Sequence, residues 1–343
     1  MRASKTVPST PTPPCIGRAR ILRDARDAGA IPEGWRAADL HVHTFFSYDV
    51  IPVSSSDPLR LYEKARQRGL HYLSFTDHDT MDAYDRVGWQ REGLVPGVEI
   101  KILDRKKVGH TIHVNVFLLD RRQFGEMKAL VSKDQDIENF LQFVRAERLP
   151  VIYNHPFWFE RGEKPNVPAV FEIARLFPVI EYNRGRIPRL NRLALEMAER
   201  HGKGMVACSD THTGRNLGAI RTHAPGESFR EYFENVSRGQ ACLVAQDMTI
   251  RGLVEEANEG IRQFFGRNPG QGAVAEFAGK LGPTYLRWLV RLLARDGLLA
   301  NNRLRRTVEG LLYALSNTAV IQSHYIRSQE SLAVRIAEQF PMS

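Results

Sequence analysis

The chain has 343 residues, a net charge of +9 and a pI of about 9.6, and 43% of its residues are hydrophobic and 25% charged. This is the composition of a globular protein with enough apolar residues for a sizeable core, in one large domain with an appendage or in two ordinary domains. The three widely spaced cysteines, Cys15, Cys208 and Cys242, argue against a secreted disulfide scaffold, and no apolar run reaches the ~18 to 20 residues of a membrane span.

The basic surplus lies mostly outside the middle of the chain. Of 48 basic and 39 acidic residues, residues 1–37 carry 7 and 3 and residues 241–343 carry 12 and 9, which leaves 29 and 27 for residues 38–240. The surplus can attract a phosphorylated substrate, but it does not identify a nucleic-acid partner.

The first fourteen residues are rich in Pro, Ser and Thr and lack the apolar core of a signal peptide. They predict a partly disordered N-terminal tail, residues 1–37, on a cytoplasmic protein. Because the tail is basic and nearly free of acidic residues, a transit peptide is the alternative.

A strand with two imidazoles follows the tail. In residues 39–43, Asp39, His41 and His43 alternate with two apolar residues. Successive side chains of a strand point to opposite faces, so both histidines are predicted on the same face.

A helix and a second strand come next. Asp57 and Pro58 supply an N-cap and a proline at the first helical position, and Gly69 closes the helix. The apolar run of residues 70–75 then ends in the polar sequence Thr-Asp-His-Asp, residues 76–79. A strand–helix–strand unit is therefore predicted.

Residues 110–119 alternate in the same way and predict another strand, followed by a helical pattern over residues 134–147. His113 and Asn115 fall on one face of this strand. If that face is the one that meets the site, a regular strand turns His110 away from it.

Three later apolar runs also end in polar residues. They are residues 151–153, which end at Asn154-His155, residues 179–182, which end at Asn183, and residues 205–208, which end at Ser209-Asp210. A helical pattern over residues 189–201 separates the last two. This rhythm favours a parallel α/β sheet or barrel with right-handed crossovers, in which the carboxyl ends of the strands converge on one site.

Beyond about residue 241 the rhythm changes, and a helical C-terminal extension, residues 241–343, is predicted. Residues 284–296 and 302–316 have the pattern of amphipathic helices. The first carries a stripe of arginines on one face: Arg287, Arg291 and Arg295. We interpret the stripe as the solvated face of a packed helix, with a membrane surface, a nucleic acid or an acidic partner as the alternative.

The polar clusters combine imidazoles with carboxylates, and such donors suit Zn²⁺, Mn²⁺ or Fe²⁺ rather than Ca²⁺ or an iron–sulfur cluster. His41 and His43 point the same way and can share one ion. Asp77 and Asp79 flank His78, where they can bind a metal or orient the imidazole. Each cluster alone also fits an ordinary polar turn. Their occurrence together at strand ends predicts a multi-metal hydrolytic site.

Over residues 38–240 these motifs resemble those of the PHP (polymerase and histidinol phosphatase) family. They are Asp-Leu-His-Val-His-Thr from residue 39, Thr-Asp-His-Asp-Thr from residue 76, Gly-Val-Glu from residue 97, Asn-His-Pro from residue 154 and Ser-Asp-Thr-His from residue 209. The resemblance implies an α/β fold with a distorted (β/α)7 TIM-like barrel, which carries a trinuclear metal centre.

The resemblance also implies which residues bind metal. By position, the first metal takes His41, His43 and Asp210, the second takes His113 and His155, Glu99 bridges these two, and the third takes His78 and His212. Asp49 lies where some relatives have a further ligand, although Ser47-Tyr48-Asp49 stands here in place of the usual Ser-Asp-Gly. His113 is assigned from strand parity and family order, and His110 is its competitor.

A metal-dependent phosphoesterase is the activity that the resemblance implies, acting on a phosphomonoester, a nucleotide or an oligonucleotide end through a metal-bridging hydroxide. Two or three divalent Zn, Mn or Fe ions are the expected cofactors. The expected substrate is a phosphorylated small molecule or nucleotide, or a nucleic-acid end. The alternatives are an amidohydrolase-like enzyme that acts on a non-phosphate substrate and a non-catalytic PHP module.

The candidate catalytic groups beside the ligands are two acids and two basic residues: Asp77, Asp79, Arg184 and Arg215. The arginines, together with Arg186, lie near strand ends where they can bind a phosphate. Glu181 ends an apolar strand, where it either lines the site or positions a basic neighbour.

Overall fold

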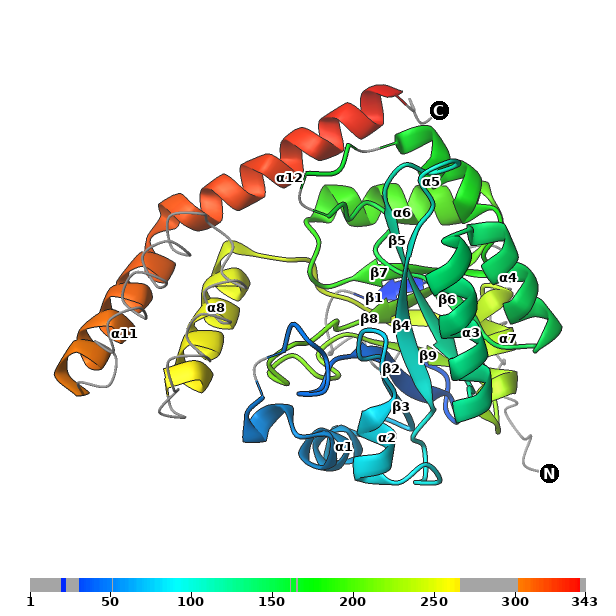
Figure 1. The fold of residues 1–343 in the computed structure, drawn as a ribbon, viewed down its shortest axis with the longest axis horizontal. Coiled ribbons are helices and arrows are strands. Elements are labelled where there is room, and N and C mark those ends of the chain that lie inside the picture. Colours follow the sequence, from blue (N-terminus) through cyan, green and yellow to red (C-terminus); the bar gives the residue numbers. More distant parts are fainter. Residues whose placement is uncertain are drawn as a thin grey trace, which may run out of the picture.

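A computed structural model of the chain describes residues 20–22, 31–50, 52–160, 162–164, 166–265 and 302–339, and its core is built from two five-stranded sheets (Figure 1). One sheet has the order β1 (Arg20–Leu22), β10 (Cys242–Val244), β9 (Arg221–Ala224), β2 (Arg36–Val42) and β3 (Tyr72–Phe75). The other has the order β4 (Gly97–Leu103), β5 (Thr111–Phe117), β6 (Val151–Tyr153), β7 (Val179–Asn183) and β8 (Gly204–Cys208). The predicted strands are therefore present, in a mixed α/β fold.

The predicted uniformly parallel arrangement is wrong for part of each sheet. β2–β3, β6–β7 and β7–β8 are parallel pairs, but β5 runs antiparallel to β4 and β6, and β9 runs antiparallel to β2 and β10. The connection from β4 to β5, residues 104–110, is too short for a crossover. Between β5 and β6 the chain forms two helices instead of one, which carry it away and back to the end of the sheet that it left.

Isolated bridges join the two sheets at the ends of the strands. His78 pairs with Glu99 beyond β3, and Val42 pairs with Thr211 beyond β8. Among the described residues no continuous ladder of hydrogen bonds closes a barrel, so the expected (β/α)7 barrel is observed as two sheets that meet along these bridges. The bridges bring the polar motifs from four separate strands to one place.

Helices cover the outer faces of the sheets. They are α1 (Pro58–Gln67), α2 (Asp82–Val87), α3 (Arg121–Asp134), α4 (Ile137–Ala146), α5 (Val167–Ala174), α6 (Pro188–Arg200) and α7 (Phe229–Ser237). The predicted N-cap of α1 is confirmed, because the Asp57 carboxylate accepts a hydrogen bond from the Leu59 amide at 2.9 Å. The helix predicted over residues 134–147 is α4, which begins after a break at Gln135, whose φ is +48°.

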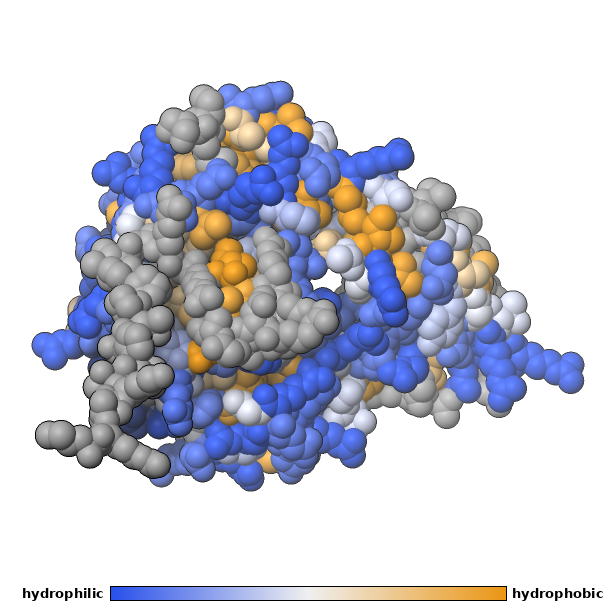
Figure 2. Space-filling model, turned by 180° about the vertical axis from the view of Figure 1, so that it is seen from behind, coloured by the Kyte–Doolittle hydropathy of each residue, from blue (hydrophilic) through white to orange (hydrophobic). Residues whose placement is uncertain are grey.

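Within the described residues, three further helices follow β10: α8 (Ile250–Phe265), α11 (Asn302–Asn317) and α12 (Ala319–Gln339). α8 and α11 pack side by side, and the long α12 runs back from them across α6 (Figure 1). From behind, most of the coloured surface is hydrophilic, with a band of hydrophobic side chains over the C-terminal helices (Figure 2). None of the helices in the described ranges is both long and apolar enough to cross a bilayer.

α11 confirms the helix predicted at residues 302–316. The helix predicted at residues 284–296, with its arginine stripe, lies outside the described residues, as does Cys15. Cys208 and Cys242 are buried in β8 and β10.

Candidate metal centre

The site begins at the carboxyl end of β2, where the alternation of the strand turns His41 and His43 to the same side. Their Nε2 atoms lie 3.1 Å apart, and both rings are fully buried. Two imidazole nitrogens this close are held together by a shared hydrogen or by a shared cation. β2 therefore presents a pair of donor atoms to a single point, as its sequence predicts.

Two carboxylate oxygens complete the arrangement around that point. Glu99 Oε2 lies 3.2 Å from His41 Nε2 and 3.3 Å from His43 Nε2. Asp210 Oδ1 lies 3.3 Å and 3.2 Å from the same two atoms. Ligands at about 2.0–2.1 Å in a tetrahedron around Zn²⁺ are separated by roughly 3.3 Å. The four donors of this first group are therefore spaced to fit a divalent transition metal.

The second group lies on the other oxygen of Glu99. Glu99 Oε1 is 2.9 Å from His113 Nδ1 and 3.3 Å from His155 Nε2. Glu99 is buried on β4. Its Oε1 faces the imidazoles of His113 and His155, and its Oε2 faces those of His41, His43 and His78, whose Nδ1 lies 3.2 Å away. A carboxylate in this position can bridge two cations.

The third group gathers around Asp49, despite the unusual Ser47-Tyr48-Asp49 sequence. Asp49 Oδ2 lies 3.2 Å from His78 Nε2 and 2.9 Å from His212 Nε2. Tyr48 stacks its ring on His78, with the ring centres 5.0 Å apart. The His212 side chain is 36% exposed, so this group forms the open side of the centre.

Together these groups bring all nine predicted ligands into one cluster of overlapping donor sets: His41, His43, Asp49, His78, Glu99, His113, His155, Asp210 and His212. The alternative residue, His110, is not among them. It lies just before β5, and its ring packs against Phe159. His113 lies on β5 and faces Glu99.

Glu181 on β7 supports the cluster through hydrogen bonds to two of its histidine residues. Its Oε1 atom is 2.7 Å from His41 Nδ1, and its Oε2 atom accepts hydrogen bonds from the His155 amide at 2.8 Å and from Asn183 Nδ2 at 3.0 Å. Asn183 also donates to Asp210 Oδ2 at 3.0 Å. Glu181 was expected either to line the site or to position a basic neighbour. In the structure its carboxylate lies beside the imidazole of His41.

Backbone strain is concentrated at the same strand ends. Asp79, His155 and Asp210 have φ values of +55°, +23° and +49°. Non-glycine residues adopt this region at a cost, and such residues cluster where the surrounding structure fixes them for function. The strain turns His155 and Asp210 toward the cluster.

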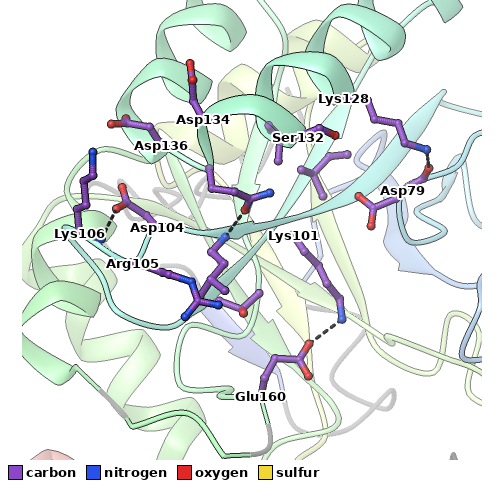
Figure 3. Close-up of a pocket in the computed structure, with 15 residues that line it drawn as sticks. Asp79, Lys101, Asp104, Arg105, Lys106, Lys128, Ser132, Asp134, Asp136 and Glu160 are labelled. Carbon is purple, nitrogen blue, oxygen red and sulfur yellow. Dashed lines mark hydrogen bonds and ion pairs between the residues drawn. The ribbon is translucent and has the colours of Figure 1, made fainter.

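The two candidate acids flanking His78 lie outside the cluster. The Asp77 carboxylate accepts hydrogen bonds from the amide and the hydroxyl of Thr44, both at 2.6 Å. Burial raises the pKa of Asp77 to about 6, although these hydrogen bonds oppose the shift. The Asp79 side chain lines a separate cavity of about 760 Å³, together with Lys101, Lys128 and Glu160 (Figure 3).

Sequence reasoning missed Lys101 and Glu160, which border the second group. Glu160 Oε1 lies 2.6 Å from Lys101 Nζ and 3.5 Å from His113 Nε2 (Figure 3). The hydrogen bond with His113, helped by Lys101, lowers the pKa of Glu160 to about 2. Lys101 lies two residues after Glu99 on β4, so the alternation of the strand indicates that both side chains share one face. Glu160 lies in a loop that carries no such signal.

The three candidate arginines have different surroundings. Arg184 lines a pocket of about 250 Å³ together with Asp210 and His212, and its Nε atom is buried with no hydrogen-bond acceptor among the described residues. Arg186 is buried and lies over the Trp158 ring, 4.3 Å from its centre. Arg215 instead donates to Glu255 on α8 at 2.6 Å. Only Arg184 among them lines a pocket shared with the cluster.

The buried carboxylates and imidazoles of the cluster shift one another's pKa values. Burial opposes the charge of the His43 imidazole, but hydrogen bonds with Asp210 and Glu99 outweigh burial and raise its pKa to about 10. Burial alone would raise the pKa of Glu99, but the surrounding histidines hold it well below its usual value. Protons on some of the imidazoles, such as that of His43, therefore compensate the buried carboxylates, whereas burial lowers the pKa of His155 to about 4. A divalent cation can take the place of those protons.

One known protein family matches part of the chain. Residues 188–241 match the family described as PHP-associated. No curated protein sequence matches the chain.

Three solved structures are similar over part of the chain. PsfC from Pseudomonas syringae PB-5123 is 20% identical, with a TM-score of 0.47 over 65% of this chain and 97% of that one. A provisionally assigned metal-dependent phosphoesterase from Bifidobacterium adolescentis is 19% identical, with a TM-score of 0.36 over 53% of this chain and 89% of that one. The lesion-specific endonuclease PfuEndoQ from Pyrococcus furiosus is 13% identical, with a TM-score of 0.45 over 61% of this chain and 57% of that one.

Proposed function

We propose that this PHP family member is a metal-dependent phosphoesterase that hydrolyses a phosphomonoester, a nucleotide or an oligonucleotide end. The observation that carries the proposal is the position of Glu99. Its two oxygens face separate imidazole groups at 2.9 to 3.3 Å, an arrangement suited to joining two cations. Structural histidine clusters have no need of a buried carboxylate shared in this way.

The donor set fits two or three divalent Zn, Mn or Fe ions. His41, His43 and Asp210 would hold one ion, His113 and His155 a second, with Glu99 between them, and Asp49, His78 and His212 a third. When bound, such ions lower the pKa of a coordinated water to about 7 and polarise a phosphoryl oxygen.

Residues of the chain prepare the donors for this role. His41 has to donate its Nδ1 proton to the carboxylate of Glu181, at 2.7 Å, for its Nε2 lone pair to face the cluster. A carboxylate behind a histidine ligand selects the tautomer and the orientation of the ring. Asn154 Nδ2 donates to Glu99 Oε1 at 3.0 Å and so holds the shared carboxylate in place.

Other groups act on the substrate or on the scaffold. We assign phosphate binding to Arg184, whose guanidinium lines the same pocket as Asp210 and His212. We assign a supporting role to Asp77, because its hydrogen bonds to Thr44 hold the chain just after His43. Asp79 and Arg215 point to neighbouring surfaces, and we assign them to the rim of the site.

A metal analysis combined with a substrate screen tests the proposal. The purified protein should contain Zn, Mn or Fe and should hydrolyse an aryl phosphate, a nucleoside monophosphate or a 5′-phosphorylated oligonucleotide. His41→Ala should lose both metal and turnover. His324→Ala, which removes an exposed histidine from α12, is the matched control and should keep both.

Two results would redirect the proposal. Hydrolysis of amides or lactones without inhibition by inorganic phosphate would favour the amidohydrolase-like alternative. Bound metal without turnover of any substrate in the screen would favour a non-catalytic module.

A further inference from the structure

A pocket of about 250 Å³ lies between the metal centre and helix α8 of the C-terminal region. Asp210 and His212 line it from the side of the cluster, and Arg184 lines it from the end of β7. The opposite wall is made by α8 and the residues just before it: Met248, Thr249, Gly252, Leu253 and Glu256. α8 lies outside residues 38–240, which carry the motifs, and it forms one side of a pocket that Asp210 and His212 also line.

Hydrogen bonds hold α8 against the segment that follows His212. The Glu256 carboxylate accepts from Thr213 Oγ1 and from Asn216 Nδ2, both at 2.6 Å. Gln263 Nε2 donates to the carbonyl oxygen of Thr213 at 3.0 Å. Because these hydrogen bonds are made within four residues of His212, they connect α8 directly to the segment that carries this histidine.

Among the residues that line the pocket, Arg184 supplies a guanidinium, and Asp210 and Glu256 supply carboxylates. The two carboxylates of α8 nearest to Arg184 are already engaged, Glu256 with Thr213 and Asn216, and Glu255 with Arg215 and Arg251. The Arg184 guanidinium keeps donors available, and its Nε is buried without an acceptor among the residues described. A buried charge-bearing donor without a partner is costly unless a ligand supplies the acceptor.

The closeness of α8 depends on a glycine. A Cβ added to Gly252 would lie 3.6 Å from Arg184 Nη2 and 3.2 Å from Thr249 Oγ1. Any longer side chain at this position therefore extends toward the guanidinium and fills the pocket. Gly252 is the third residue of α8, in its first turn, and its amide donates to Thr249 Oγ1 at 3.0 Å.

We propose that α8 closes the substrate pocket of the metal centre and that Gly252 sets its size, which restricts the enzyme to small-molecule phosphomonoesters whose anionic group lies on Arg184. This inference rests on the proposed phosphoesterase function. Pockets for drug-sized ligands span roughly 300–1,000 Å³, so the volume at α8 suits a phosphate with a small organic group.

The test compares Gly252→Leu with Gly260→Leu. Both glycines lie within α8, but a Cβ at Gly260 meets no atom within 4 Å, so its variant controls for placing a leucine in this helix away from the pocket. Both substitutions replace a helical glycine and are expected to fold. The readouts are metal content, inorganic phosphate binding by calorimetry, and kcat/KM for phosphomonoesters of increasing size.

We expect Gly252→Leu to keep its metal, to weaken phosphate binding at least about tenfold and to lower kcat/KM most for the larger esters. Gly260→Leu should behave like the wild type. Unchanged phosphate binding and unchanged turnover in Gly252→Leu would overturn the role of α8 while leaving the phosphoesterase intact. Preferential cleavage of 5′-phosphorylated oligonucleotides by the wild type would overturn the small-substrate assignment.

Failure of the proposed function has a different signature. If the wild type binds phosphate and Gly252→Leu does not, the pocket stands even when no ester is hydrolysed. If the wild type neither binds phosphate nor hydrolyses any ester, both proposals are wrong.

Discussion

The Nδ1 atom of His41 lies 2.7 Å from Oε1 of Glu181, and this contact joins β2 to β7 directly beneath the metal centre. The two residues are 140 positions apart in the chain. The contact fixes which nitrogen of His41 faces the cluster, and the other oxygen of Glu181 holds the backbone of His155. One carboxylate therefore orients residues of two of the donor groups.

Glu181→Gln should weaken metal binding by about 10 to 100-fold, because an amide cannot accept the Nδ1 proton of His41 and both backbone and side-chain donors at once. The measurement is a competition titration with a chelator of known affinity. Glu172→Gln, on the exposed side of α5, is the control and should bind metal normally. Equal affinity in both variants would show that the contact does not orient a ligand.

Asp49→Asn should remove one metal per chain and leave the other two bound. Asp49 Oδ2 lies within 3.2 Å of His78 Nε2 and of His212 Nε2, whereas the carboxylates of the first two groups are Glu99 and Asp210. The metal content of both proteins can be measured by mass spectrometry after dialysis. A variant with the same stoichiometry as the wild type would mean that the Asp49 group holds no ion.

Metal affinity should rise with pH between about 6 and 10. The pKa of His43 is raised to about 10, so the metal-free protein keeps a proton that a metal must displace. In the metal-free state this raised pKa stabilises the fold fully below the ordinary value of 6.5, and the stabilisation is lost as the pH rises through about 10. Calorimetry in buffers of different ionisation enthalpy measures the released protons, and a pH-independent affinity would contradict the assignment.

Asp77→Ala should lower the free energy of unfolding by about 2–3 kcal/mol, because it leaves the buried amide and hydroxyl of Thr44 without acceptors. Asp82→Ala, at an exposed position at the start of α2, is the control and should change stability by less than about 0.5 kcal/mol. Chemical denaturation of the metal-free proteins compares the two. Equal stability of the two variants would remove the supporting role of Asp77.

Arg184→Gln should weaken inorganic phosphate binding at least about tenfold, since a hydrogen bond to a charged group contributes about 1.5–3 kcal/mol. Arg215→Gln should have a much smaller effect, because Arg215 is paired with Glu255 on the surface. From the sequence alone both arginines were candidates for phosphate binding. Comparing the two variants therefore tests the positions that the structure gives them. A larger loss in Arg215→Gln would place the anion on the other side of α8.

The strands and most helices of the motif-bearing segment were predictable because their signals are local. Alternation in residues 39–43 and 110–119 reflects the period of a strand with one face in the core, and the Asp57-Pro58 N-cap marks the start of α1 within two residues. The same period chose His113 over His110. The donor types and their order also pointed to a metal cluster, since mixed imidazoles and carboxylates at strand ends have few other uses.

Strand direction and the surroundings of the cluster were not predictable in the same way. Whether β5 runs parallel or antiparallel to β6 depends on the number of helices that return the chain, and the short break at Gln135 between α3 and α4 was not apparent from composition. Glu160 and Glu181 are ordinary acids in the sequence, and each acquires a role only through a histidine far away in the chain.

The amino-acid order by itself determined the donor atoms of this protein and the strands that carry them, because residue type and side-chain period are properties of short segments. Only the tertiary structure decided that Glu99 lies between two groups of imidazoles, that Glu181 supports His41 and that α8 lies beside Arg184. Those relationships depend on distances between segments up to 140 residues apart. They are set by sheet order and helix packing, which no local pattern encodes.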